Sequence, residues 1–312
     1  MNELITETLE KKSVKKDVNK LSRTLIYCQI ILILIYFFCT FFLYFKNNYS
    51  IDTITEKYEG IIYIVSVTAG CLCFLHYYKY NSTQDISTVT KKLSFRNIII
   101  CTAIILALQF FSQIAISLLE TSLNIFGYSL INSLEQVANP SGTISMFLYA
   151  SFIGPLIEEF IFRGIIIKKL EKYGKMFAII ISSVMFGFYH SNAYQGIIAF
   201  SIGLLLGYIA LEYSIKYSII LHIINNMILS ELYSLINNNI NAAIANVVSF
   251  LLFAGAVVVF IVAINKYKRR LHEYVKDDHI FKNIYKYAFT SSFFIVFLAL
   301  NAIISFISIE KI

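Results

Sequence analysis

The chain has 312 residues, of which 58% are hydrophobic and 14% are charged, and its formal net charge is +7. Soluble globular domains contain about 25% charged residues, so this composition excludes an ordinary soluble protein. Only two prolines and twelve glycines interrupt the apolar runs. The composition therefore predicts an all-α protein, a polytopic bundle of transmembrane helices.

Apolar stretches of spanning length follow one another along the chain. A membrane-spanning helix needs about 20 mainly apolar residues, and by this rule we expect eight or nine spans. The short polar joints at 191–194 and 213–216 are the least certain boundaries. The expected spans are residues 24–45, 60–78, 97–119, 143–167, 176–191, 194–212, 217–235, 241–264 and 285–308.

The lysines and arginines give these spans an orientation. With a cytoplasmic amino terminus, 22 of the 26 basic residues fall in cytoplasmic segments, 3 fall outside and Arg163 lies within a span. Basic residues concentrate on the cytoplasmic side of membrane proteins, so the asymmetry predicts this orientation. It also accounts for the positive charge without nucleic acid as a partner. The lysines of residues 1–23 could form an interfacial helix on anionic lipid, but we favour a solvated tail.

The chain divides into four regions on this basis. A basic cytoplasmic amino-terminal segment (1–23) precedes the first three spans and their loops (24–142). The central helices (143–235) come next, and the last spans with a basic cytoplasmic loop (236–312) follow them. We therefore expect an integral, multi-pass membrane protein. Its richness in isoleucine, lysine, asparagine and tyrosine is compatible with an AT-rich bacterial genome, and we expect the protein in a bacterial cell membrane.

Ionisable residues inside the expected spans gather in one part of the chain. A charged side chain near the centre of a bilayer costs about 2.5–3.5 kcal/mol, so each needs a compensating role. The first three and the last two expected spans carry no carboxylate or arginine at depth. This clustering predicts one polar site. Its members are Glu158, Glu159, Arg163, His190 and His222, joined by the amides Asn225 and Asn226.

Helical geometry separates the two adjacent glutamates. Glu159 and Arg163 are four residues apart, so they share a helix face and can form a buried ion pair. Glu158 lies about 100° away round the helix, without that partner. We therefore expect a structural role for Glu159 and a free carboxylate at Glu158, suited to general base catalysis. Pro155, three residues before Glu158, is expected to kink the helix.

Two further helices supply imidazoles and amides. His190 follows Gly187 on one helix face, and we expect Gly187 to leave room beside the ring. His222 and Asn226 are four residues apart and share a face. Asn225 lies near the edge of that face and is a weaker candidate.

The expected depths of these side chains in the membrane do not establish that they meet, and each side chain could have a purely structural role. Counting about 1.5 Å per residue from the cytoplasmic helix ends puts Glu158, His190 and His222 about 15, 22 and 9 Å deep, which does not by itself bring them together. Each residue alone also has a structural interpretation, as a clamp or an interhelical hydrogen bond. Together they could activate water and stabilise an oxyanion, and we favour this catalytic interpretation.

Three short motifs in this region resemble those of a known family. The sequence EEFIFR (158–163) resembles EExxxR, FGFYH (186–190) resembles FxxxH, and HIINN (222–226) resembles HxxxN. Their order and spacing resemble the CAAX protease and bacteriocin-processing family of intramembrane endopeptidases, which includes the type II CAAX prenyl proteases. The resemblance covers about residues 143–235.

The resemblance implies a peptide-bond hydrolase whose site lies within the membrane and opens to the cytoplasm. Glu158 and His190 would activate the attacking water, and His222 and Asn226 would stabilise the tetrahedral oxyanion. The pair Glu159 and Arg163 would support the site. The partners would be membrane lipid, a membrane-associated peptide or protein substrate and, in some members, a regulated membrane protein. The motifs do not choose between prenyl-protein cleavage, bacteriocin processing or immunity, and membrane regulation.

The motifs leave open whether the site uses a metal ion and whether the protein is an enzyme at all. One carboxylate and two histidines could hold zinc with an open position for water. We favour a metal-free glutamic mechanism without a cofactor, because Asn226 beside His222 suits an oxyanion hole and Glu158 would otherwise be both ligand and base. Intramembrane carboxylates and histidines also mark proton-coupled transporters. A non-catalytic immunity or sensor-modulating protein that acts by binding is the other alternative.

Overall fold

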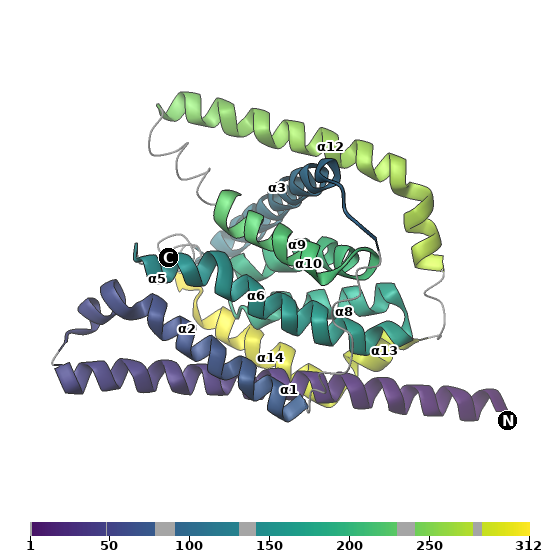
Figure 1. Cartoon of the computed structure of the whole chain (residues 1–312), viewed down its shortest axis with the longest axis horizontal. Coiled ribbons are helices and arrows are strands. Elements are labelled where there is room, and N and C mark those ends of the chain that lie inside the picture. The colour runs from purple at the N-terminus through teal and green to yellow at the C-terminus, as the bar shows by residue number, and fades with distance from the viewer. Residues whose placement is uncertain (1, 48, 79–90, 131–141, 230–240, 277–282) are drawn as a thin grey trace.

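The computed structural model describes residues 2–47, 49–78, 91–130, 142–229, 241–276 and 283–312. Most of these residues are helical, so the prediction of an all-α helix bundle is confirmed (Figure 1). The number of spans and their orientation stay predictions. Within the described residues, five helices are long and apolar enough to cross a membrane: Thr8–Lys46, Ile51–Tyr78, Phe95–Ile125, Ala193–Glu212 and Ala243–Arg269.

The helices that carry the predicted site lie in the middle of the bundle (Figure 1). The first part is one helical segment in which α-helical and wider π-helical stretches alternate. Its elements are α5 (Ile144–Leu148), η1 (Tyr149–Ile153), α6 (Gly154–Glu159), η2 (Phe160–Ile167), α7 (Lys168–Leu170) and the 3-10 turn η3 (Glu171–Tyr173). The second part consists of α8 (Lys175–Tyr189), α9 (Ala193–Glu212), α10 (Ile215–Ile223) and its π-helical continuation η4 (Ile224–Leu229).

Helices from both ends of the chain flank one side of these central helices. Helix α1 (Asn2–Asn47) runs along α2 (Ile51–Tyr78) and contacts α13 (Ile284–Phe289) and α14 (Ser292–Ile307). Figure 1 shows α14 between α1 and the central helices. The first and last parts of the sequence therefore form one wall against the site helices.

The opposite side is formed by two further helices. Helix α12 (Ala242–Lys276) packs on α3 (Phe95–Ile125), and α3 packs on α9. A two-residue strand after α3, β1 (Tyr128–Ser129), pairs antiparallel with β2 (Glu310–Lys311) near the carboxyl end. The site helices thus lie between two walls of apolar helices (Figure 1).

Many large apolar side chains face outward in this protein, while the charged pair Glu159 and Arg163 is hidden between helices. Phe38 and Phe250 are 67% and 70% exposed, whereas Glu159 is fully buried and Arg163 is 2% exposed. Exposed apolar surface is unfavourable in water by about 25 cal/mol per Å². In a bilayer the lipid tails cover that surface, and the helices shield the charges from hydrocarbon. The distribution is that of an integral membrane protein.

The amino-terminal segment is not the solvated tail expected from its lysines. Val14 and Val18 are fully buried in the main core, because apolar residues recur along one face of α1 between the lysines. The carboxylate of Asp17 accepts a hydrogen bond from Tyr173 Oη at 2.9 Å and lies 2.7 Å from Lys172 Nζ. Burial alone would lower the pKa of Lys172, but Asp17 raises it above its ordinary value. This end of α1 is therefore fixed to the end of the site helix.

Several helices extend beyond the expected spans. Helix α1 ends at Asn47 and α2 begins at Ile51, so most of the expected loop 46–59 is helical. Helices α3 and α12 likewise continue past 119 and 264. The prediction counted apolar residues, which marks the membrane-crossing part of a helix and not its polar ends. The last part of the expected span 217–235 lies outside the described residues.

Gly60 provides a test of the packing between α2 and the start of the site helix. A methyl group at Gly60 would lie 2.2 Å from the backbone nitrogen of Met146, whereas one at Gly255 of α12 meets no atom within 4 Å. Overpacking costs about 1–3 kcal/mol, and alanine is favoured over glycine within a helix by about 0.5–1 kcal/mol. We expect Gly60→Ala to lower the melting temperature of the detergent-purified protein and Gly255→Ala to leave it equal or higher. A Gly60→Ala variant that melts at or above the wild-type temperature would contradict this packing.

Candidate active site

The first motif lies where an α-helical stretch passes into a π-helix. Glu158 and Glu159 are the last residues of α6, and η2 follows directly. Before α6, the N–H group of Gly154 bonds to the carbonyl of Tyr149, five residues back. This wider spacing accommodates the missing N–H of Pro155 without ending the helix. The kink expected at Pro155 therefore takes the form of a widened turn beside the glutamates.

The predicted ion pair between Glu159 and Arg163 is confirmed. Arg163 Nη1 lies 2.9 Å from Glu159 Oε1, and both side chains are buried. Nη2 donates to the carbonyl of Gly203 in α9 at 3.5 Å. The guanidinium carbon lies 4.3 Å from the ring centre of Phe186, a cation–π contact. Arg163 thus joins η2, α8 and α9, and its charge is balanced by Glu159 in the bundle interior.

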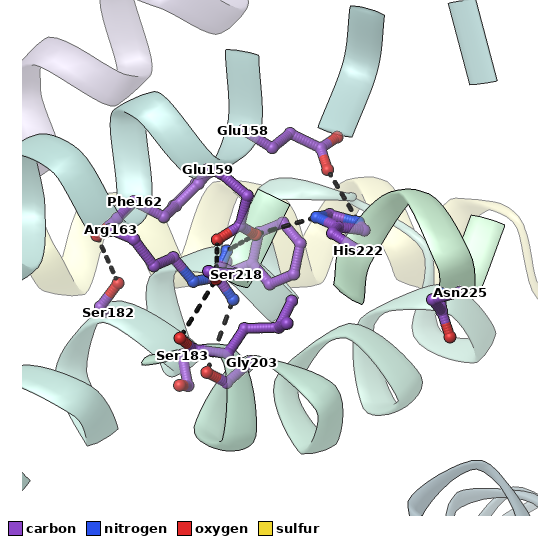
Figure 2. Close-up of polar contacts among 12 residues, drawn as sticks. Glu158, Glu159, Phe162, Arg163, Ser182, Ser183, Gly203, Ser218, His222 and Asn225 are labelled. Atoms are coloured by element: carbon purple, nitrogen blue, oxygen red, sulfur yellow. Dashed lines mark hydrogen bonds and ion pairs between the residues drawn. The ribbon is translucent and has the colours of Figure 1, made fainter. Parts of the chain in front are cut away.

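The second partner of Glu159 is His222, which lies in α10. His222 Nδ1 is 2.8 Å from Glu159 Oε1, and Ser218 Oγ donates to Glu159 Oε2. Ser218 Oγ also lies 3.1 Å from the carbonyl of Leu206. A carboxylate only accepts hydrogen bonds, so Nδ1 of His222 carries the hydrogen. Figure 2 shows this group, in which Glu159 has an arginine, a histidine and a serine around it.

Glu158 lies on the other side of the same imidazole. Its Oε2 atom is 3.6 Å from His222 Nε2, and its side chain is 21% exposed, while Glu159 is fully buried. His222 therefore lies between two adjacent glutamates, with one ring nitrogen toward each (Figure 2). The expected difference between a committed and an accessible glutamate is present in this geometry.

His190 reaches the same region from the end of α8. Its Nδ1 atom is 2.8 Å from the carbonyl of Phe186, and a carbonyl only accepts, so Nδ1 carries the hydrogen and Nε2 is the free nitrogen. The ring of Phe186 packs edge-on against both imidazoles, at 4.9 Å from His190 and 5.9 Å from His222. Phe186 therefore brings together two histidines whose depths, counted from the sequence, differ.

Asn226 is held by a chain of amide groups. Gln109 Nε2 donates to Asn225 Oδ1 at 2.8 Å, and Asn225 Nδ2 donates to Asn226 Oδ1 at 2.8 Å. Asn226 Nδ2 then donates to the carbonyl of Ala150 in η1 at 3.0 Å. Each amide in this chain fixes the orientation of the next one. Asn225, the weaker candidate in the sequence, is therefore the residue that orients Asn226.

Other contacts of the site were not expected from the sequence. Ser218 lies one helical turn before His222, and this spacing of four is the signal that would have identified it. Gln109 lies in α3, far from the motifs in sequence, so no spacing could have identified it as part of the site. Gly187 does not leave room beside His190: a methyl group there would lie 2.8 Å from the carbonyl of Gly196, because α8 and α9 touch at this point.

Carboxylates and imidazoles, the groups at this site, are also common metal ligands. Among the described residues, no group of three or more His, Cys, Asp or Glu side chains is arranged to hold a metal ion. One of the two glutamates is already paired with the guanidinium of Arg163. The described residues therefore present no zinc-binding arrangement at this site.

The comparison with known proteins agrees with the motifs. Residues 140–228 match the family described as type II CAAX prenyl endopeptidase Rce1-like, and all three motifs lie within this segment. The resemblance to the CAAX protease and bacteriocin-processing family is therefore confirmed over this part, which is less than a third of the chain. No curated protein and no solved structure matches the sequence. The helices outside residues 140–228 have no counterpart in this match.

The Glu159–Arg163 pair predicts a large stability effect. Removing one partner of a buried ion pair costs about 3–5 kcal/mol, because the other charge stays buried without compensation. We expect Glu159→Gln to lower the free energy of unfolding, measured by denaturant titration in detergent, by this amount. As a control, Glu212→Gln removes a carboxylate that pairs with the exposed Lys91 and Lys175, and it should cost at most about 1 kcal/mol. Equal stability of the two variants would contradict the structural role of Glu159.

Proposed function

We propose that the protein is an intramembrane endopeptidase of glutamic type that hydrolyses a peptide bond of a membrane-associated peptide or protein. In this proposal Glu158 takes a proton from water, the water oxygen attacks the carbonyl carbon, and a tetrahedral oxyanion forms. The carbon–nitrogen bond then breaks, and the proton held by Glu158 passes to the leaving amine. The family match supports a CAAX-type endopeptidase, and the mechanism is our proposal.

The position of Glu158 is the observation that carries the proposal. Its neighbour Glu159 is fully buried and bound by three side chains, whereas the carboxylate of Glu158 is partly exposed and 3.6 Å from His222 Nε2. A carboxylate beside an imidazole, with space for water, suits proton transfer. The committed glutamate would hold the site together and the accessible one would act on water.

The two histidines have different surroundings, which supports different roles. His190 has its Nδ1 atom occupied by a backbone carbonyl, so the unprotonated Nε2 can accept a hydrogen bond from water and orient it with Glu158. His222 lies between two carboxylates, with Nδ1 toward Glu159 and Nε2 toward Glu158. Its Nε2 atom would donate a hydrogen bond to the negative charge that develops on the substrate oxygen.

Asn226 would complete the oxyanion site. One N–H of its amide is used by the carbonyl of Ala150, which leaves the other for the substrate oxygen. Asn225 fixes the amide oxygen, so the donor end cannot turn away without breaking that bond. Preorganised donors of this kind contribute about 10²–10³-fold to the rate of acyl transfer in other enzymes.

We further propose a bacterial cell membrane as the location and substrates that enter from the bilayer. The proposal does not choose between a bacteriocin-like peptide, another membrane protein and a prenylated chain. A proton-coupled transporter needs ionisable groups along a path, whereas those described here gather around His222. A membrane protein that acts by binding alone would not need the accessible carboxylate of Glu158.

Substitution of Glu158 tests the proposal directly. Removal of a general base costs about 10²–10⁴-fold in rate, so peptides with new termini found in membranes that contain the wild-type protein should be absent with Glu158→Ala. Glu171→Gln, which changes a glutamate in an exposed pair with Lys168, is the matched control and should leave these termini unchanged. Quantitative proteomics of membranes with equal amounts of each variant provides the measurement. Identical termini with Glu158→Ala and with the wild type would refute the proposal.

Metal removal tests the proposed mechanism. We expect the purified protein to keep its cleavage rate after dialysis against a strong zinc chelator, because the proposed proton acceptor is Glu158 itself. The rate before and after dialysis is compared on a substrate identified by the proteomic experiment. Complete loss of cleavage that zinc restores would exclude the metal-free mechanism.

A further inference from the structure

The turn that carries His190 is short and conformationally unusual. Helix α8 ends at Tyr189 and α9 begins at Ala193, so His190 lies in a three-residue joint. Ser191 has a φ of 52°, in the left-handed region that residues other than glycine rarely adopt. Such a conformation persists only where surrounding contacts enforce it, and it recurs at functional sites. The left-handed backbone of Ser191 therefore requires contacts that hold it in place.

Two amide side chains hold this turn from outside. Ser191 Oγ donates to Asn301 Oδ1 at 2.5 Å, and Gln29 Nε2 donates to the carbonyl of Tyr189 at 3.1 Å. The residues before and after His190 are thus each bound by one amide. Gln29 lies in α1 and Asn301 in α14, far from the turn in sequence.

The two amides also bind each other. Gln29 Nε2 donates to Asn301 Oδ1 at 2.7 Å, and Asn301 Nδ2 lies 3.4 Å from Gln29 Oε1. The other hydrogen of Asn301 Nδ2 bonds to the carbonyl of Phe297 at 2.8 Å. Each amide has two N–H groups, and all four of these groups are therefore hydrogen-bonded. Asn301 is 1% exposed, so its amide lies in an environment of low dielectric, where losing a hydrogen bond is costly.

A simpler interpretation is that Gln29 and Asn301 only join α1 to α14. Amides often do this between membrane helices. That interpretation accounts for the bonds between the two amides, but not for the bonds to Tyr189 and Ser191, which go to α8 and its turn. It also does not account for the left-handed backbone of Ser191 directly after a predicted catalytic residue.

We propose that Asn301 and Gln29 are positioning residues for His190. Their contacts would fix the backbone on both sides of the imidazole and so hold its Nε2 atom toward Glu158 and the attacking water. This inference rests on the proposed function. It gives the two terminal helices, which lie outside the segment matched to the family, a specific part in the chemistry.

The test uses Asn301→Leu and a milder variant, Gln29→Met, which keeps the side-chain volume and removes the donors. Ser112→Ala is the matched control, because Ser112 Oγ donates to Ser201 Oγ at 3.0 Å in a part-buried contact between α3 and α9, away from the turn. Hydrogen–deuterium exchange of the detergent-purified full chain reports on the peptide that spans residues 187–194. The rate at which the Glu158-dependent termini form, measured at equal protein amounts, reports on catalysis.

We expect exchange of this peptide to become about tenfold faster or more in Asn301→Leu and Gln29→Met, while Ser112→Ala stays within twofold of wild type. We expect the cleavage rate constant to fall about tenfold in the same two variants, with substrate half-saturation unchanged. Unchanged exchange at the turn in both variants would overturn the inference, as would faster exchange with undiminished cleavage. If Glu158-dependent termini do not exist, the proposed function fails, and the exchange measurement alone then decides whether the amides hold the turn.

Discussion

The site depends on a histidine held between two adjacent glutamates inside a membrane protein. His222 presents Nδ1 to Glu159 at 2.8 Å and Nε2 toward Glu158 at 3.6 Å. Two neighbouring carboxylates repel each other, and desolvation makes each of them costly. Arg163 compensates the buried one. The remaining carboxylate belongs to the only one of the two side chains that is partly exposed, and this asymmetry underlies the proposed chemistry.

The asymmetry originates in the helix itself. Adjacent residues of a helix point about 100° apart, so two glutamates in a row cannot share one environment. Here Glu159 turns into the bundle, toward Arg163 and α10, and Glu158 stays at the edge of the site. π-helical stretches lie on both sides of α6. Their wider turns change the direction of the side chains that follow, and so contribute to the different surroundings of the two glutamates.

Much of this arrangement could be predicted from the sequence, because it follows from local spacing. The helix bundle follows from the apolar runs, and the Glu159–Arg163 pair follows from a spacing of four. What the sequence could not give is how far each helix is shifted along its axis. The meeting of His190 with His222 depends on that shift and on the ring of Phe186 between them.

Hydrogen-bond partners on helices distant in sequence could not be predicted either, because local spacing carries no information about them. Gln109 reaches Asn225 from α3, and Gln29 reaches Tyr189 from α1. The lysines of the amino-terminal segment suggested solvent, whereas Val14 and Val18 between them pack in the core. Hydropathy measures where a helix meets lipid and not which of its faces meets another helix.

Nitrogen-15 NMR of the histidine rings tests the central arrangement most directly. The protein has five histidines, and each resonance can be assigned by substitution. The account predicts that Glu158→Gln shifts the Nε2 resonance of His222, while Glu159→Gln shifts its Nδ1 resonance. If neither nitrogen of His222 responds to either substitution, the histidine does not lie between the two glutamates and the proposed site is wrong.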